Sequence, residues 1–164
     1  MERKRFDQQP CPIARAADLF GDWWVPLILR EALYGVDQFN EFAERLDISK
    51  NILQQRLQHL VEAGIFERQL YCERPQRFRY RLTERGRSAL QLLAAMAAWS
   101  NRWVFEEGQH PIELVDRRTG QVVEPVVTDA RSGQPLQAEH LEMRPGPGFP
   151  SSPEIRAWRF GEGA

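Results

Sequence analysis

The stretch SKNILQQRLQHLVEAG, residues 49–64, decides the fold of the first part of this chain. Its apolar residues recur at intervals of three or four, at Ile52, Leu53, Leu57, Leu60 and Val61. This spacing predicts a helix with these residues facing inward, which Ser49 can cap and Gly64 can end. Residues 38–46 show the same period, and a short turn at 47–49 separates the two segments. Two short helices joined by a tight turn form a helix-turn-helix.

Two further helices are predicted before this unit. Pro12 suits the first position of a helix that ends near Gly21. Asp22 can cap a second helix, which begins WWVPLILREAL and ends at Gly35. The helix-turn-helix is therefore expected to be the second half of a group of four helices.

The period of the sequence changes after the helix-turn-helix. Residues 65–71 and 78–82 are rich in β-forming side chains, and the segment CERPQR at 72–77 separates them. This pattern predicts an antiparallel hairpin. Thr83 can then cap a long last helix that runs to about Phe105. The resulting order predicts a winged helix-turn-helix, a fold that is mainly α with one small β-hairpin (α+β).

The last third of the chain differs in composition. Two similar tetrapeptides, RTGQ at 118–121 and RSGQ at 131–134, are each flanked by β-formers and predict two hairpin turns with glycine at positive φ. Residues 155–160 are expected to dock as a short apolar segment. We therefore expect a DNA-binding and dimerisation domain, a small β-rich extension and a flexible Pro/Gly-rich tail, at residues 1–105, 106–144 and 145–164.

The net charge of −1 conceals an uneven distribution. Residues 48–87 hold nine Lys or Arg and four Glu, a net charge of +5. Residues 106–164 hold six basic and ten acidic side chains, a net charge of −4. Because basic patches bind the phosphates of nucleic acids, the distribution favours a DNA-binding segment that the overall charge hides.

Several classes of protein are disfavoured by the sequence. It has no Ser-His-Asp set, glycine-rich phosphate loop or metal-binding motif, so we expect neither an enzyme nor a cofactor. The charged start MERKRFDQQP lacks the apolar core of a secretion signal, and the longest apolar run, residues 92–99, is too short to cross a membrane. We expect a cytoplasmic protein that does not contact membranes.

The candidate DNA contacts lie on the second helix of the helix-turn-helix and on the hairpin. Asn and Gln can pair with adenine, whereas Lys and Arg can pair with guanine or phosphate. Along the second hairpin strand, alternation turns Phe78 and Tyr80 to the core and the arginines to solvent. The candidates are Ser49, Lys50, Asn51, Gln54, Gln55 and Arg56 on the helix, and Arg74, Arg77 and Arg79 on the hairpin. The alternatives are an ordinary polar helix surface and a hairpin edge protected by positive charge.

Five motifs follow one another between residue 11 and about residue 103. They are CP at 11–12, GDWWVPLIL at 21–29, FNEF at 39–42, LQQRLQHLVEAG at 53–64 and YRLTERG at 80–86. In this combination the chain resembles the HxlR-type transcriptional regulators, relatives of the MarR group. The resemblance implies a homodimer, formed through the first and last helices, that binds a palindromic operator in double-stranded DNA.

The last helix supports a dimer independently of the resemblance. Ala89, Leu90, Leu93, Met96, Ala97 and Trp103 form one stripe, and Leu92, Ala95, Trp99 and Val104 widen it. So wide an apolar surface exceeds what one small domain can cover. Burial within the monomer is the alternative. Trp23, Trp24, Trp99 and Trp103 could line a pocket for a small-molecule effector, although packing is the usual role of such tryptophans.

Two features of the resemblance concern cysteines. Some HxlR-type proteins sense oxidants or electrophiles through a cysteine that matches Cys11, and a position before a helix favours the thiolate. A plain helix-start residue is the alternative. The extension resembles that of longer members, in which cysteines occupy the positions of Thr119, Asp129 and Ser132. Without those thiolates we expect a ribbon-like segment that holds no metal.

The sequence therefore favours a DNA-binding transcriptional regulator, more specifically a repressor. A winged-helix adaptor that binds protein partners and no longer binds DNA is the alternative.

Overall fold

A computed structural model describes residue 6 and residues 8–150 of the chain. The segment expected at 155–160 and most of the Pro/Gly-rich tail lie outside the described residues. The chain divides into two compact units, residues 19–126 and residues 1–18 with 127–164. The first unit contains the helix-turn-helix and the hairpin.

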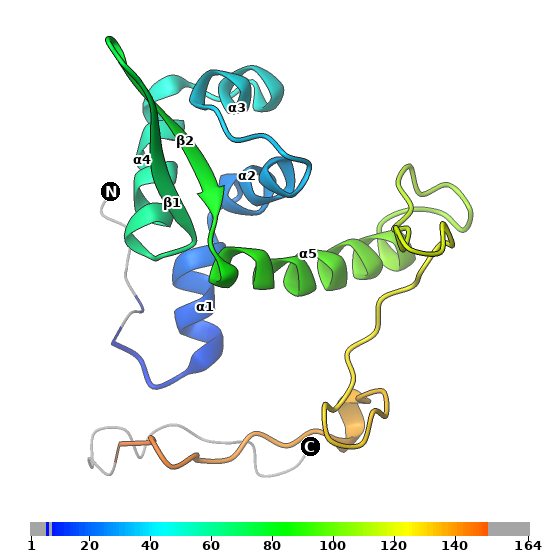
Figure 1. Cartoon of the computed structure of the whole chain (residues 1–164). Coiled ribbons are helices and arrows are strands. Elements are labelled where there is room, and N and C mark those ends of the chain that lie inside the picture. Colours follow the sequence, from blue (N-terminus) through cyan, green and yellow to red (C-terminus); the bar gives the residue numbers. More distant parts are fainter. Residues whose placement is uncertain (1–5, 7, 151–164) are drawn as a thin grey trace. The chain divides into compact units, whose positions relative to one another are not determined.

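The order of elements is that of a winged helix-turn-helix (Figure 1). It comprises helices α1 (Pro12–Phe20), α2 (Trp24–Leu33), α3 (Phe39–Leu46) and α4 (Lys50–Glu62), strands β1 (Phe66–Glu73) and β2 (Gln76–Leu82), helix α5 (Glu84–Trp103) and a short 3-10 helix, η1 (Ala138–His140). The predicted α+β fold class is confirmed.

Polar side chains fix the ends of these helices. The Ser49 hydroxyl accepts a hydrogen bond from the backbone N–H of Ile52 at the start of α4, and the Thr83 hydroxyl accepts one from Gly86 at the start of α5. The Asp22 carboxylate accepts one from the N–H of Trp24 at the start of α2. Asp47 ends α3 in the left-handed conformation, with φ 49°, which produces the tight turn to α4.

The hairpin, or wing, is longer than the sequence pattern indicates. Pairing continues to Glu73 and Gln76, so that the turn contains two residues and not the six predicted. An irregularity between Leu70 and Cys72 shifts the register and allows the pairing to continue. A single bridge between Gln38 and Arg79 adds the start of α3 to the outer edge of β2.

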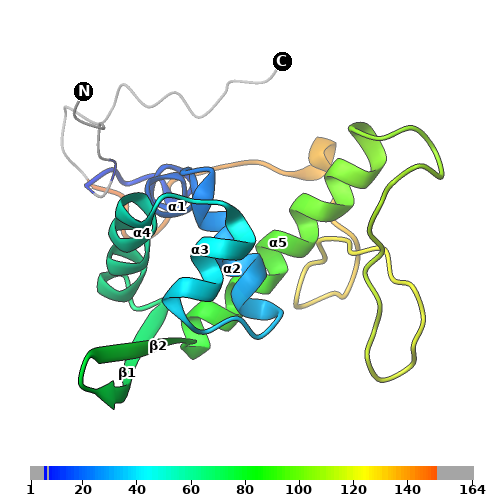
Figure 2. The same cartoon turned by 90° about the horizontal axis from the view of Figure 1, so that it is seen from above.

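The core lies where α2, α3, α4 and β1 meet (Figure 2). Its fully buried side chains include Ile28, Leu29, Phe42, Leu53, Leu57, Leu60 and Phe66. The Phe66 ring contacts the rings of Phe42 and Tyr80 edge to face, which joins the wing to the helices. The expectation that Ile52 packs inward is wrong, because 37% of it is exposed at the start of α4.

The extension forms the two predicted glycine turns. Gly120 and Gly133 both have φ 70°, and each donates its N–H to the carbonyl of an aspartate four residues earlier. In both turns the aspartate carboxylate, of Asp116 or Asp129, accepts a further N–H from the residue two positions on. The hydrogen bonds from Arg118 and from Ser132 lower the pKa values of Asp116 and Asp129, respectively. Each turn carries one isolated β-bridge, Val115 with Val122 and Thr128 with Pro135.

Candidate nucleic-acid interface

One face of α4 presents polar side chains to solvent over its first two turns. Lys50, Asn51, Gln54 and Gln55 are all exposed, whereas Leu53 and Leu57 on the opposite face are fully buried. The helical period places these four side chains together because positions three and four apart share a face. Together with Ser49, which is exposed in front of them, they form a surface that can enter a DNA groove.

Arg56 lies apart from this surface. Its guanidinium Nη2 is 2.9 Å from Oδ2 of Asp22, and its side chain is 29% exposed. The residue is on the flank of α4 that faces the start of α2, since it is one turn from the buried Leu53 and Leu60. The ion pair joins residues that are far apart in the sequence, so no local sequence pattern predicts it.

The arginines of the wing also fall into two groups. Arg74, Arg77 and Arg81 are exposed, and Arg68 stacks on the Phe78 ring with its guanidinium carbon 3.9 Å from the ring centre. Arg79 instead reaches the loop before α3, where Nη1 is 3.0 Å from Oδ2 of Asp37.

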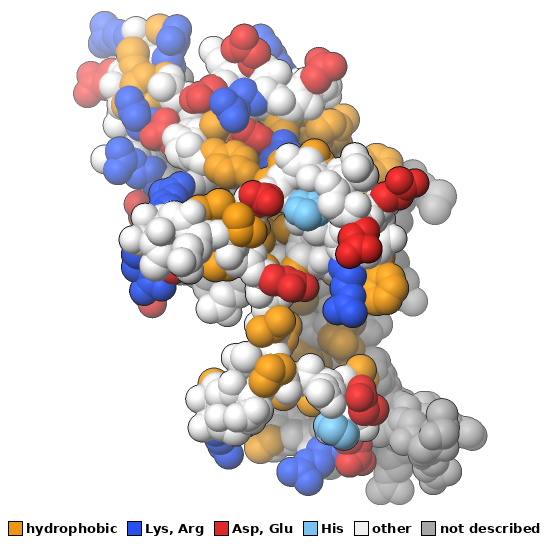
Figure 3. Space-filling model, turned by 90° about the vertical axis from the view of Figure 1, so that its right-hand side faces the viewer, with side chains coloured by type: hydrophobic (Ala, Val, Ile, Leu, Met, Phe, Trp, Pro, Cys, Tyr) orange, Lys and Arg blue, Asp and Glu red, His pale blue; other side chains and the backbone are white. Residues whose placement is uncertain are grey.

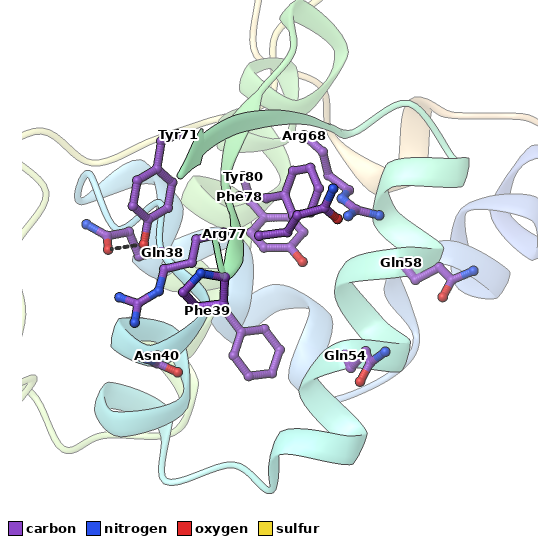
Figure 4. A pocket seen from close by; sticks show the side chains of 12 residues that line it. Gln38, Phe39, Asn40, Gln54, Gln58, Arg68, Tyr71, Arg77, Phe78 and Tyr80 are labelled. Carbon is purple, nitrogen blue, oxygen red and sulfur yellow. Dashed lines mark hydrogen bonds between the residues drawn. The ribbon is translucent and has the colours of Figure 1, made fainter. Parts of the chain in front are cut away.

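A groove of about 400 Å³ separates the wing from the helix-turn-helix (Figure 4). Most of its lining consists of amide side chains and aromatic rings. The lining residues are Gln38, Phe39, Asn40, Gln54, Gln58, Arg68, Tyr71, Pro75, Gln76, Arg77, Phe78 and Tyr80. Tyr71 of β1 donates a hydrogen bond of 3.0 Å to Oε1 of Gln38 across it. Sequence reasoning missed Gln38, Asn40 and Tyr71, because the groove that they line forms only when the wing packs beside the helix-turn-helix.

The positive charge follows the wing. In Figure 3, Lys and Arg side chains gather at the top of the molecule, where the hairpin lies, with Asp and Glu among them. The described face thus agrees with the excess of basic residues in the sequence between 48 and 87.

Cys11 caps α1. Its sulfur accepts a hydrogen bond from the N–H of Ala14 at 3.4 Å, and the residue is half-buried. The nearby Arg15 donates to the carbonyl of Gln9 at 2.7 Å. Cys72, also half-buried and free, lies in the wing, where its thiol donates to the carbonyl of Arg74.

A broad apolar face of α5 is exposed in the single chain. Leu92, Met96, Trp99 and Trp103 share this face and are between 40% and 66% exposed. Trp23, next to the start of α2, is 79% exposed. Side chains of this size rarely stay in contact with water over so wide an area.

The remaining expectations concern ligands. A second groove, of about 610 Å³, lies between the end of α5 and residues 107–125, and it contains none of the four tryptophans considered for an effector pocket. Within residues 6 and 8–150, no group of three or more His, Cys, Asp or Glu is placed to hold a metal ion. In the same part of the chain, no helix has the length and apolarity needed to cross a membrane.

Comparison with known proteins identifies the class to which this fold and surface belong. The chain is 36% identical over 137 residues to an uncharacterized HTH-type transcriptional regulator of Mycobacterium tuberculosis, Rv3095, and the match covers 84% of this chain and 87% of that protein. It is 31% identical over 96 residues to another, YvaP of Bacillus subtilis, over 57% of this chain and 89% of that protein. The fold and these relatives define a helix-turn-helix transcriptional regulator of the MarR-related winged-helix type.

Solved structures agree. PA1607, a candidate transcription factor, superposes with a TM-score of 0.75 at 37% identity, covering 84% of this chain and 96% of that one. The reduced form of the regulator YodB from B. subtilis superposes with a TM-score of 0.51 at 34% identity, covering 60% and 98%. The profile of the HxlR-like helix-turn-helix family matches residues 19–108, and the chain belongs to that family.

Proposed function

We propose that the protein is a cytoplasmic repressor that binds a palindromic DNA operator as a homodimer. The observation that carries the proposal is the exposed polar face of α4 next to the basic wing, with Lys50, Asn51, Gln54 and Gln55 all free of the core. Carboxamides read adenine in the major groove, while Lys and Arg bind guanine or phosphate. Gln54 and Gln55 are therefore proposed to read bases.

The wing and the groove supply contacts to the DNA backbone in this proposal. With α4 in the major groove, the arginines at the hairpin tip, Arg74 and Arg77, reach phosphates or the adjacent minor groove. The groove between α4 and the wing accommodates the strand that runs between them, and its amide side chains can donate hydrogen bonds to phosphate oxygens. Arg68 adds positive charge to its wall.

The apolar face of α5 supports the homodimer. A second copy would cover Met96, Trp99 and Trp103, and a two-fold axis there would present two copies of α4 to the DNA. Two-fold symmetry in the protein requires two-fold symmetry in the operator, which is why a palindrome is proposed.

Regulation by thiol oxidation is a further part of the proposal. YodB has been solved in its reduced form, and HypR, described as a redox regulator, in reduced and oxidized forms. HypR in its reduced form is 30% identical to this chain. The corresponding candidate here is Cys11, which lies half-buried at the start of α1.

The test is selection of bound DNA by the purified full chain from genomic fragments, followed by titration at several salt concentrations. We expect tight binding to a palindromic site that weakens steeply as salt rises. Gln55→Ala should reduce the preference for that site, and Lys50→Ala should weaken binding to all duplexes. Gln91→Ala, on the exposed side of α5, is the matched control.

The outcome also decides between DNA and a protein partner. A winged-helix adaptor would bind no fragment selectively and would be indifferent to Gln55→Ala and Lys50→Ala. Repeating the titration with an oxidant tests the sensor, and an equal response from the Cys11→Ser variant would exclude Cys11.

A further inference from the structure

We infer that three carboxylates on α2 and its two flanks, Asp22, Glu31 and Asp37, set the positions of the DNA-facing elements, and that Arg56 and Arg79 are positioning residues and not phosphate contacts. The inference rests on the proposed DNA-binding function. It removes Arg56 and Arg79 from the expected phosphate contacts and assigns both of them a positioning role.

Each carboxylate holds a different element. Asp22, before α2, pairs with Arg56 of α4 at 2.9 Å. Glu31, within α2, pairs with Arg45 of α3 at 2.6 Å. Asp37, after α2, pairs with Arg79 of the wing at 3.0 Å. One helix and its flanks are therefore connected by ion pairs to both helices of the helix-turn-helix and to the hairpin.

Burial distinguishes these pairs from arginines that are available to DNA. The side chains of Asp22 and Asp37 are 11% and 22% exposed, and each is more covered than the arginine that it holds. An arginine that left for a phosphate would give up a charged contact with a largely covered carboxylate, which is costly. The Nε atom of Arg56 is also buried and has no hydrogen-bond partner. Arg56 is thus packed against the protein over part of its guanidinium.

Backbone contacts reinforce the pair between Asp37 and Arg79. The N–H of Tyr80 donates to the carbonyl of Asp37 at 2.7 Å, and Gln38 bridges to Arg79. The side-chain pair and these backbone bonds are directional, so they fix the orientation of the wing in a way that apolar packing alone does not.

The Asp22 pair also connects α4 to the start of α2. Asp22 accepts a hydrogen bond from the N–H of Trp24, the first residue of α2, and follows α1 by two residues. A change in the conformation of the chain at Asp22 would therefore act on α4 through Arg56. Phosphate binding is left to the exposed basic residues of α4 and the wing, which are Lys50, Arg68, Arg74, Arg77 and Arg81.

The inference is tested by the salt dependence of DNA binding. The full chain is titrated against a fluorescein-labelled duplex of mixed sequence by anisotropy at several salt concentrations. The plot of log K against log salt has a negative slope, and each lost phosphate contact makes that slope shallower by about 0.9. Arg77→Gln is the matched control and should make the slope shallower by that amount. Arg56→Gln and Arg79→Gln should weaken binding several-fold at every salt concentration and leave the slope unchanged.

Asp22→Asn gives the sharpest outcome. Asn retains an oxygen that can accept from the Trp24 N–H but removes the negative charge. Simple electrostatics predicts tighter DNA binding, because a repulsive charge has been lost. The positioning role predicts weaker binding, and it predicts that Asp22→Asn adds little to Arg56→Gln in the double variant. Arg56→Lys, which can keep the ion pair, should restore most of the affinity and serves if Arg56→Gln does not fold.

The experiment separates failure of the inference from failure of the proposed DNA-binding function. A slope that becomes shallower for Arg56→Gln as it does for Arg77→Gln, or tighter binding by Asp22→Asn, would overturn the inference and leave the proposed function intact. Absence of binding to any duplex by the unmodified chain would overturn the proposed function itself.

Discussion

The Cα of Gly86, in the first turn of α5, packs directly against the carbonyl oxygen of Ile65. A Cβ built on Gly86 would overlap that oxygen and would lie 2.9 Å from Cδ2 of Leu82. Thr83 strengthens the same junction, since its hydroxyl donates to the carbonyl of Gly64 at 2.7 Å and accepts from the N–H of Gly86. The end of the helix-turn-helix and the start of α5 are thus joined at a point where only glycine fits.

Gly86→Ala should destabilise the protein by about 1–3 kcal/mol, because the methyl group must displace backbone. Urea unfolding of the full chain measures the change. Gly146→Ala is the control, since a Cβ at Gly146 has no neighbour within 4 Å. Equal stability of the two variants would show that the junction is looser than described.

Glu31→Gln should lower stability by about 1–3 kcal/mol at neutral pH, because the buried carboxylate accepts charged hydrogen bonds from Arg45 and Arg30. Burial alone raises the pKa of Glu31, but the hydrogen bonds from these two arginines outweigh it, and the pKa is lowered.

The lowered pKa also gives the pH dependence. The carboxylate contributes its stability above its pKa in the unfolded chain, about 4.3, and loses it as the pH falls through the lower folded value. Thermal unfolding between neutral and acidic pH should therefore show that the difference between the original protein and Glu31→Gln shrinks in acid. A difference that stays constant would mean that the ionised carboxylate is not its source.

Ser49 should show separable effects on stability and on DNA binding. Ser49→Ala removes the cap of α4 and should cost about 1 kcal/mol. Ser49→Asp keeps a capping oxygen and places negative charge at the helix start, so stability should be retained. The same charge repels phosphates, and duplex binding by anisotropy should weaken about tenfold. Unchanged binding by Ser49→Asp would place the start of α4 away from the DNA.

Trp99→Glu should convert the proposed dimer to a monomer. Trp99 is 63% exposed in the single chain, so the substitution removes little packing within the monomer. Light scattering coupled to size exclusion measures the mass, and Gln91→Glu, an exposed position that introduces the same charge on the same helix, is the control. A dimer that survives Trp99→Glu would assign the interface to another face.

The sequence alone determined the fold, because each element carries a local signal. Ser49 and Thr83 cap their helices as predicted, and Gly120 and Gly133 form the turns that their tetrapeptides indicate. Caps, periodicity and positive-φ glycines depend on residues a few positions apart, so they can be read along the chain. The exposed polar face of α4 follows from the same periodicity.

Only the tertiary structure decided which basic residues are held in ion pairs with distant carboxylates. Arg56 and Arg79 have the composition of a nucleic-acid surface, yet Asp22 and Asp37 hold them, from 34 and 42 positions away in the sequence. The hydrogen bond from Tyr71 to Gln38, in the groove beside the wing, likewise joins residues that are 33 positions apart in the sequence. Ion pairs of this kind depend on where distant side chains meet once the core has packed, and no periodicity or charge count along the chain encodes that meeting.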